Sequence, residues 1–438
     1  MNSEQTVPPS PAAGPALRTV VKSQHDGKWH IAGDICVVGA GIAGISAALE
    51  AARLGLKVVL VDGLPALGGQ AVNANIGNIA GLFSNGPNPV QLTHGIADDM
   101  LRELGAQGAI HYAFSPVVNC VFYDELALGR WIDESVRKAG ITAVVGAVLC
   151  GVHRHGRRVE EITVATRFGQ LRISATGFVD ATGDAALTWE AGLPCREPVT
   201  PIYGSQMVVL ENLREEKNPS YPELWARARA KAEQYGLVRK EGFICFLPGR
   251  GIATVNMTHV ESPLEPASAT LKMFEGRNQA DRVFEFLRSE FPECFGNARI
   301  RAYGIPGVRQ TRWIVGCHQL TAAEVGSAFR FPDSIGRTAW IPEIHDDAAA
   351  IDWRPTADDP VHYIPLGCLL PPDADNLAAA GRCADGDAIA LSSIRVKGPC
   401  IAMGAAAAHA LALAGRGSVH EIDIGALQGR LRRNLEDC

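Results

Sequence analysis

Residues 34–63 read DICVVGAGIAGISAALEAARLGLKVVLVDG, and this pattern predicts a strand, a tight turn, a helix and a second strand. The apolar letters ICVV suit a strand that is buried on both faces, and the alanine-rich letters after the turn suit a helix. The turn carries a GxGxxG motif, formed by Gly39, Gly41 and Gly44. In such a unit the first glycine allows the tight turn, the second lets the backbone approach a pyrophosphate, and the third lets the helix pack on the strand. The stretch is therefore predicted to be a dinucleotide-binding βαβ unit.

An acidic residue follows this motif at the distance expected for a dinucleotide site. Asp62 ends the second predicted strand, where a carboxylate would bind ribose hydroxyls. Small residues come next, at Gly63, Gly68 and Gly69, followed by Gln70. A glycine pair gives a second place where backbone can touch a large planar cofactor. The arrangement resembles the glutathione-reductase-like flavoproteins, in which a GG pair lies along the flavin; the alternative is an ordinary surface turn.

A second motif lies at 177–187, which read GFVDATGDAAL. Its apolar letters predict a buried strand, and Ala181, Thr182 and Gly183 stand at the carboxyl end of that strand, where ligands of parallel sheets bind. Asp184 follows directly. We expect Asp184 either to cap the next helix or to take part in catalysis.

The composition argues against several classes of protein. The chain has 47% hydrophobic and 20% charged residues, a formal net charge of -6 and scattered basic residues, so we expect neither a nucleic-acid partner nor a membrane-binding patch. The 11 cysteines contain no CxxC pair, which disfavours a dithiol centre and a metal site and fits reduced thiols in the cytoplasm. The alanine-rich segment 399–414 is short for a membrane span, so a buried helix is expected there.

Hydrophobic periodicity predicts further elements along the chain. Helices are expected at 89–104, 124–139, 221–235 and 267–287, and strands at 142–151, 158–165, 169–173, 244–247, 252–258 and 376–380. The letters HRHGRR at 153–158 predict a solvated hairpin tip. An extended lead-in at 20–31 is expected to be anchored by Trp29.

Three later blocks resemble a known family. They are GIPGVRQTRWIVGCHQLT at 304–321, FPDSIGRTAWIPEIHD at 331–346 and YIPLGCLLPPDADNLAAAGRC at 363–383. These blocks are similar to the bacterial FAD-dependent oxidoreductases, which are related to the fumarate-reductase flavoproteins. Together with the first motifs, the resemblance spans about 34–414. The chain departs from the family's pattern at Gln310, where an acid is common, and at Glu343, which follows Pro342 and stands two residues before the later histidine.

The resemblance implies an α/β fold: a Rossmann-like FAD-binding domain of the glutathione-reductase type, with an inserted antiparallel β-meander and a second, α+β substrate domain. We expect a disordered tail at 1–17, the FAD-binding domain at 33–190 and 350–425, and the substrate domain at 191–349. The residues expected to hold FAD come from the motifs above and from two later segments: Gly39, Gly41, Ala43, Gly44, Asp62, Gly63, Gly68, Gly69, Gln70, Val148, Ala181, Thr182, Gly183, Asp184, Gly381, Arg382, Ile394 and Arg395.

Polar residues of the substrate domain are the candidates for catalysis. Arg309 offers a charged fork to a substrate carboxylate or a developing oxyanion, and His345 and His318 can move a proton near neutral pH. The neighbouring Arg312 offers a second guanidinium. For each of these residues the alternative is a structural role in an ion pair or a hydrogen-bonded loop.

The expected function is hydride transfer between a small polar substrate and flavin N5, by a dehydrogenase or oxidase that uses an external acceptor or oxygen. A flavin monooxygenase, a reductase of activated double bonds with an external donor, and a non-enzymatic flavoprotein stay open, as does a homo-oligomer. The GxG in PGRGIAT at 248–254 precedes a β-rich run. It is therefore not expected to be a second nucleotide site, and no nicotinamide site is expected.

Overall fold

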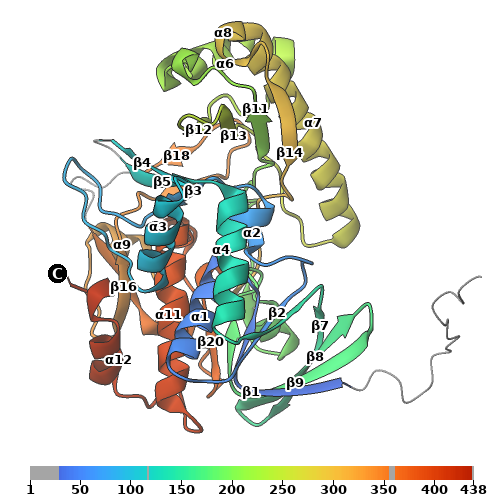
Figure 1. The fold of residues 1–438 in the computed structure, drawn as a ribbon. Helices are drawn as coiled ribbons and strands as arrows, with labels where there is room; N and C mark the ends of the chain where they lie inside the picture. Colours follow the sequence, from blue (N-terminus) through green and yellow to red (C-terminus); the bar gives the residue numbers. More distant parts are fainter. Residues whose placement is uncertain (1–28, 116–117, 355–360, 437–438) are drawn as a thin grey trace, which may run out of the picture.

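The computed structural model describes residues 29–115, 118–354 and 361–436. The expected tail at 1–17 and most of the lead-in at 20–31 lie outside these residues. The described chain has a lower part built around a large mixed sheet and an upper part built around a smaller antiparallel sheet (Figure 1). The chain is thus a mixed α/β protein with a parallel sheet.

The large sheet has seven strands, and its register places the two sequence motifs side by side. In sheet order the strands are β6 (Thr142–Val145), β2 (Val58–Asp62), β1 (Trp29–Val38), β9 (Gly169–Asp180), β8 (Arg158–Thr166) and β7 (Val148–His155), and β20 (Leu377–Ala379) pairs with the far end of β9. Strands β7, β8 and β9 pair antiparallel, and the other pairs are parallel. Val38 is level with both Val61 and Asp180. The turns after β1 and β9 therefore leave the same edge of the sheet.

Two helices rich in small residues cover this part of the sheet and touch each other closely. They are α1 (Ile42–Arg53) and α11 (Lys397–Ala414), which lie side by side in Figure 1. A Cβ on Gly404 would lie 2.1 Å from the carbonyl oxygen of Ala43, so the two backbones meet where only glycine fits. Helix α11 is buried as expected; no single helix in the described ranges is long and apolar enough to cross a membrane, although α10 (Ala388–Ile394) and α11 pass that test only as a pair bent by 89°.

The rest of the lower part surrounds these layers. A three-stranded antiparallel sheet is formed by β3 (Asn78–Ala80), β5 (Asn119–Tyr123) and β4 (Ile110–Phe114). The helices are α2 (Gly69–Asn73), α3 (Ile96–Ala106), α4 (Glu125–Lys138), α5 (Ala186–Glu190), α9 (Ala322–Gly326) and α12 (Ile424–Arg430). Short antiparallel pairs join β10 (Cys195–Arg196) to β15 (Trp313–Ile314), β16 (Ser334–Thr338) to β19 (His362–Pro365), and β17 (Glu343–Ile344) to β18 (Asp352–Trp353). Single 3-10 turns lie at Leu366–Leu369, Gly381–Cys383 and Arg432–Asn434, and another, at Glu215–Lys217, belongs to the upper part.

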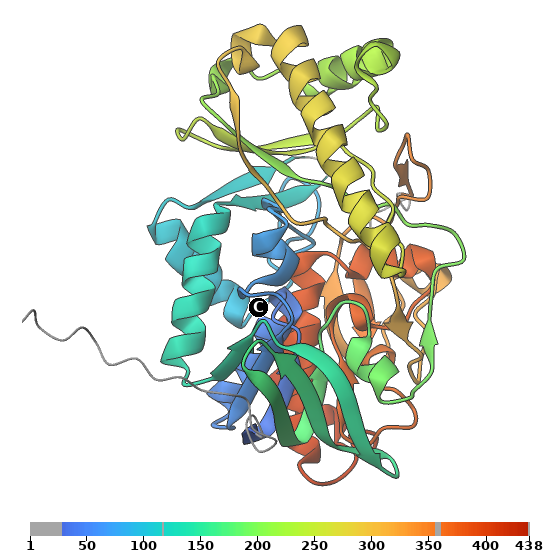
Figure 2. The ribbon, with the colours of Figure 1, turned by 90° about the vertical axis from the view of Figure 1, so that its right-hand side faces the viewer.

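The upper part has a hydrophobic core of its own. Its sheet has the order β12 (Phe243–Leu247), β13 (Ile252–Asn256), β11 (Val208–Glu211) and β14 (Arg299–Tyr303). Helices α6 (Tyr221–Tyr235), α7 (Pro266–Glu290) and α8 (Pro292–Phe295) pack on it, and α7 descends along one side of the molecule (Figure 2). This core contains buried residues from Val208 to Ala298, whereas Trp313, Leu320 and Ile335 join the core of the lower part.

Most predicted elements are present, and three expectations are corrected. The strand predicted at 142–151 is two strands, because Gly146 adopts a φ of +63° and turns the chain between β6 and β7. The helix predicted at 89–104 begins only at Ile96, after Gly95 with a φ of +78°. Trp29 begins β1 but is 61% exposed, so it anchors nothing there.

Candidate active site

A cavity of about 1240 Å³ runs between the lower and upper parts of the molecule. At one end it is lined by the turn after β1, and at the other by β12 and α6. Most of the residues expected to hold the dinucleotide line it, including Ala43, Val148, Gly381, Arg382 and Arg395. The two ends of this cavity have different chemistry.

The three glycines of the first motif have separate roles. A Cβ on Gly39, which has a φ of +102°, would lie 2.2 Å from the carbonyl oxygen of Ala181, and a Cβ on Gly44 would lie 1.8 Å from the carbonyl oxygen of Gly39. A Cβ on Gly41 would meet no atom within 4 Å, because Gly41 faces the cavity. Among the described residues, no side chain caps the N-terminus of α1. Its N–H groups and the open space at Gly41 together suit an anion.

Asp62 lies at the cavity edge, beside Gly63. Its two carboxylate oxygens accept hydrogen bonds from the backbone N–H groups of Ala40, at 2.5 Å, and Leu64, at 2.7 Å. Burial raises the pKa of Asp62, against these two bonds. A carboxylate accepts about four hydrogen bonds, so Asp62 retains acceptor capacity for a ligand hydroxyl.

The glycine pair after Asp62 packs against the first glycine turn. Gly68 has a φ of +93° and donates its N–H to the carbonyl oxygen of Ala40 at 2.9 Å. A Cβ on Gly69 would lie 2.6 Å from the Cα of Gly41. Gly69 and Gln70 line the cavity, whereas Gly68 stands behind it. The pair is therefore not an ordinary surface turn, since Gly69 forms part of the cavity wall and Gly68 packs behind it.

The second motif reaches the cavity through Ala181, Thr182, Gly183 and Asp184. The expectation that Asp184 caps the next helix is wrong, because α5 has no side-chain cap among the described residues. The Asp184 carboxylate instead accepts a hydrogen bond from the hydroxyl of Thr311. Gly183 has a φ of +81°, and a Cβ there would lie 2.2 Å from Arg382 Nη2. Arg382 Nη1 donates to the carbonyl oxygen of Val308 at 3.0 Å.

Positive charge gathers at the other end of the cavity. Three arginines, Arg239, Arg309 and Arg395, line it together with one carboxylate, Glu343. Burial lowers the pKa of Arg309 and Arg395 to about 9 and that of Arg239 to about 10, and it raises the pKa of Glu343. At neutral pH the three guanidinium groups remain charged, so cations outnumber anions in this cluster.

A pair of histidines adjoins the arginines. His345 Nδ1 is 3.0 Å from His259 Nε2, and His259 Nδ1 is 2.8 Å from the carbonyl oxygen of Ala348. Burial, with nearby arginine charges, lowers the pKa of both, in His259 to about 2, so both rings are neutral. Because a carbonyl only accepts, His259 carries its proton on Nδ1, and His345 must donate from its own Nδ1. Nε2 of His345 is therefore unprotonated; it has no hydrogen-bond partner among the described residues and lies 3.7 Å from Glu343 Oε2.

Tyr203 connects Arg309 to the histidines. Its carbonyl oxygen accepts from Arg309 Nη1 at 2.6 Å, and its N–H donates to the carbonyl oxygen of His345 at 2.7 Å. Its ring stacks on His259, with the centroids 5.8 Å apart. One loop residue therefore fixes the positions of Arg309, His259 and His345.

Besides Gly68, four expected residues lie away from the cavity lining. His318 is paired with Glu324 at 3.1 Å, so the geometry gives no support to a proton-transfer role for it. Arg312 lies over the ring of Trp189, 3.4 Å from Glu197. Ile394 is buried beneath the lining, and Gly44 acts in packing.

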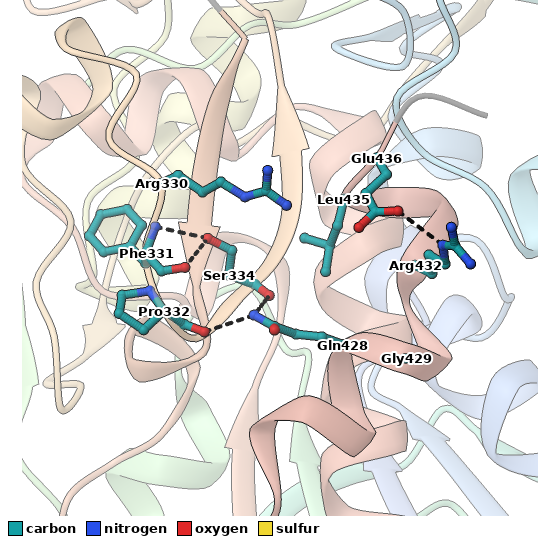
Figure 3. A pocket seen from close by; sticks show the side chains of 9 residues that line it. All are labelled: Arg330, Phe331, Pro332, Ser334, Gln428, Gly429, Arg432, Leu435 and Glu436. Carbon is teal, nitrogen blue, oxygen red and sulfur yellow. Dashed lines mark hydrogen bonds and ion pairs between the residues drawn. The ribbon is translucent and has the colours of Figure 1, made fainter.

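A second cavity, of about 470 Å³, lies between the segment that leads into β16 and the C-terminal helix α12 (Figure 3). The amide of Gln428 reaches across to the carbonyl oxygens of Pro332 and Ser334, at 2.8 and 3.2 Å. None of the residues singled out in the sequence lines this cavity.

Comparison with known families shows which family the chain belongs to. The model of the family described as FAD dependent oxidoreductase matches residues 34–431, a range that includes both sequence motifs and the charged cluster. The chain belongs to this family. It is an enzyme, and FAD is its cofactor.

The residues at the glycine end fit FAD. Gly41 leaves room for a pyrophosphate beside the uncapped start of α1, and Asp62 retains acceptors for a ribose. Helix α11 also begins at the cavity without a side-chain cap. Its positive end suits the negative charge of a reduced flavin.

Solved structures give weaker likenesses. The chain is similar to a geranylgeranyl bacteriochlorophyll reductase-like protein from Thermoplasma acidophilum, at 15% identity and a TM-score of 0.45, over 92% of this chain and 85% of that one. It is also similar to the flavin-dependent brominase Bmp2, at 13% identity and a TM-score of 0.45, over 92% of this chain and 83% of that one. A third likeness is to CabE, an aromatic hydroxylase from angucycline biosynthesis, at 12% identity and a TM-score of 0.42, over 92% of this chain and 68% of that one. These scores support no assignment for this chain. The search of curated proteins found no match.

Several residues of the site carried no usable signal in the sequence. Arg239, Tyr203 and His259 come from three separate segments of the upper part and its connections. Their only signal is a basic or polar residue beside an apolar strand, and such residues are common at protein surfaces. The fold was needed to bring them to one cavity.

Proposed function

We propose that this enzyme oxidises a small organic substrate that carries an anionic group, and that His345 takes the substrate proton. The observation that supports this most strongly is the position of His345 Nε2, which has no hydrogen-bond partner among the described residues and is buried in the same cavity as the FAD motifs and the arginines. A proton acceptor beside a hydride acceptor is what removal of two hydrogens requires.

The proposed step breaks two bonds of the substrate. A C–H bond breaks with its electron pair, and bound FAD supplies the two-electron acceptor at N5. The proton from the adjoining O–H or N–H group goes to Nε2 of His345. The substrate leaves with a new double bond between carbon and the heteroatom, and the electrons later pass to an external acceptor or to oxygen.

The arginines make the basicity of His345 depend on whether a substrate is bound. Their charges contribute to the low pKa of His345, and an anionic group between them would oppose that effect. Arg309 has one Nη1 bond to Tyr203 and offers its remaining N–H groups to that anion. The base would therefore be strongest when substrate is bound.

The domain organisation and the cellular location are also part of this proposal. We place the FAD-binding domain, of Rossmann-like glutathione-reductase type with β7 to β9 as its inserted meander, at 33–190 and 350–425, and the substrate domain within 191–349, with the core of its own at 208–298. The small four-stranded sheet supports a separate substrate domain. A cytoplasmic location is supported by the ten free cysteines among the described residues.

Anaerobic reduction of the bound flavin tests the role of His345. A panel of amines, hydroxy acids and polyols is mixed with the holoenzyme, and bleaching of the flavin band is timed for the fastest member. His345→Gln should slow bleaching by roughly a hundred-fold or more, because the amide has no basic nitrogen. His318→Gln, outside the cavity, is the matched control and should bleach at the wild-type rate. Equal rates for His345→Gln and wild type, or no bleaching by any panel member, would overturn the proposal.

A further inference from the structure

The geometry points to an aromatic carboxylate as the substrate class, with its carboxylate held by Arg239 and its ring lying against a wall of aromatic side chains. This inference rests on the proposed function and names the kind of substrate that the same cavity takes. It depends on two features at the end of the cavity away from the glycine turn: the aromatic wall and the unused face of one guanidinium.

The aromatic wall consists of five cavity-lining residues, Tyr221, Trp225, Phe243, Trp340 and Trp353. Their rings touch in sequence, with centroids 5.9 Å apart from Tyr221 to Trp225 and from Trp225 to Phe243, 6.4 Å from Phe243 to Trp353, and 6.3 Å from Trp353 to Trp340. All except Trp340 are only half-buried. The wall therefore presents apolar surface to the cavity, and a planar apolar ligand would cover it.

Arg239 stands beside this wall. The side chain is 1% exposed, and its guanidinium carbon lies 6.0 Å from the centre of the Phe243 ring. Nη1 donates to Asn256 Oδ1 at 2.9 Å, but Nε and Nη2 have no partner among the described residues, and none of those residues forms an ion pair with Arg239. Nε and Nη2 form the side of the guanidinium that binds a carboxylate with two parallel hydrogen bonds.

Leaving two charged N–H groups buried without acceptors is costly. A ligand carboxylate would satisfy both, and Arg309, which lines the same cavity, adds a second positive charge there. An aromatic wall also suits cations. Here Arg239, Arg309, Arg395 and Lys397 share the cavity, so a cationic ligand would be repelled.

Binding of benzoate tests this inference without turnover, because benzoate has no hydride to give. Calorimetric titration of the holoenzyme should show benzoate binding at least ten-fold more tightly than benzamide, which lacks the charge, and than acetate, which lacks the ring. Arg239→Met should weaken the binding of benzoate roughly ten-fold or more. Trp353→Leu should weaken the binding of benzoate about three-fold but leave the binding of acetate unchanged. Arg282→Met, an exposed arginine on α7, is the matched control.

Flavin content and melting temperature verify that each variant folds. If Arg239→Met does not fold, Arg239→Lys replaces it, since lysine retains the charge but loses the paired N–H groups. The inference is overturned if benzoate does not bind, if benzamide or acetate binds as tightly, or if both Arg239 variants bind benzoate like the wild type. Failure of the proposed hydride chemistry would instead appear as unbleached flavin with benzoate binding intact.

Discussion

Gly41 and Gly44 are three residues apart, yet an added methyl group would have opposite consequences at the two positions. At Gly41 the Cβ would enter the cavity and meet no atom within 4 Å, whereas at Gly44 it would lie 1.8 Å from a backbone oxygen. The first glycine of this pair therefore serves the ligand, and the second serves the fold. The sequence motif names both residues but cannot separate their contributions to stability from their contributions to binding.

We expect Gly41→Val to abolish FAD binding without unfolding the chain. Gly41 has φ and ψ of -68° and 177°, an extended conformation that valine adopts readily, and the valine side chain would fill the pyrophosphate position. Purified protein should be colourless, with a melting temperature like that of wild-type apoprotein. The matched Gly44→Val variant should not fold. A yellow Gly41→Val protein with normal FAD content would contradict this assignment.

The first turn of α11 holds a lysine at the edge of the cavity. Lys397 begins this helix at the cavity edge, and its Nζ donates to the carbonyl oxygens of Ile76 and Asn78, at 3.2 and 2.6 Å. It lies 5.5 Å from the centre of the Tyr123 ring. Burial lowers the pKa of Lys397 from 10.5 to about 7, so it titrates near neutral pH.

This pKa predicts how stability depends on pH. Between pH 7 and 10.5 the unfolded chain holds the Lys397 proton and the folded chain releases it, so this group makes the free energy of unfolding rise with pH. Urea unfolding at saturating FAD, measured from pH 7 to 8.5, should show a smaller rise of the free energy of unfolding in Lys397→Met than in wild type. Lys138→Met, an exposed lysine on α4, should leave the rise unchanged. Identical pH slopes for Lys397→Met and wild type would refute the prediction.

At the scale of the whole molecule, local patterns predicted the elements that depend on local physics. The βαβ unit, helix α6 and the hairpin at β7 and β8 follow from periodicity and turn residues, and the structure confirms them. The two glycines that broke predicted elements, Gly146 and Gly95, act through left-handed backbone conformations that periodicity does not reveal.

The charged cluster could be predicted only in part, because it is assembled across distant segments. The family resemblance predicts Arg309 and His345 as candidates, but Arg239, Tyr203 and His259 reach them through the pairing of the upper sheet and through hydrogen bonds of long sequence separation. His318 pairs with Glu324, and it lies outside the cavity lining, so the geometry gives no support to its predicted role.

The most direct test of this account is anaerobic flavin reduction by a carboxylate substrate and by its carboxamide, in the wild type and in Arg309→Lys. The account predicts that the carboxylate bleaches the wild-type flavin and the carboxamide does so far more slowly. Arg309→Lys should lower the carboxylate rate by roughly ten-fold or more, with FAD content and melting temperature nearly unchanged. Equal bleaching by the two compounds, or by wild type and Arg309→Lys, would contradict it.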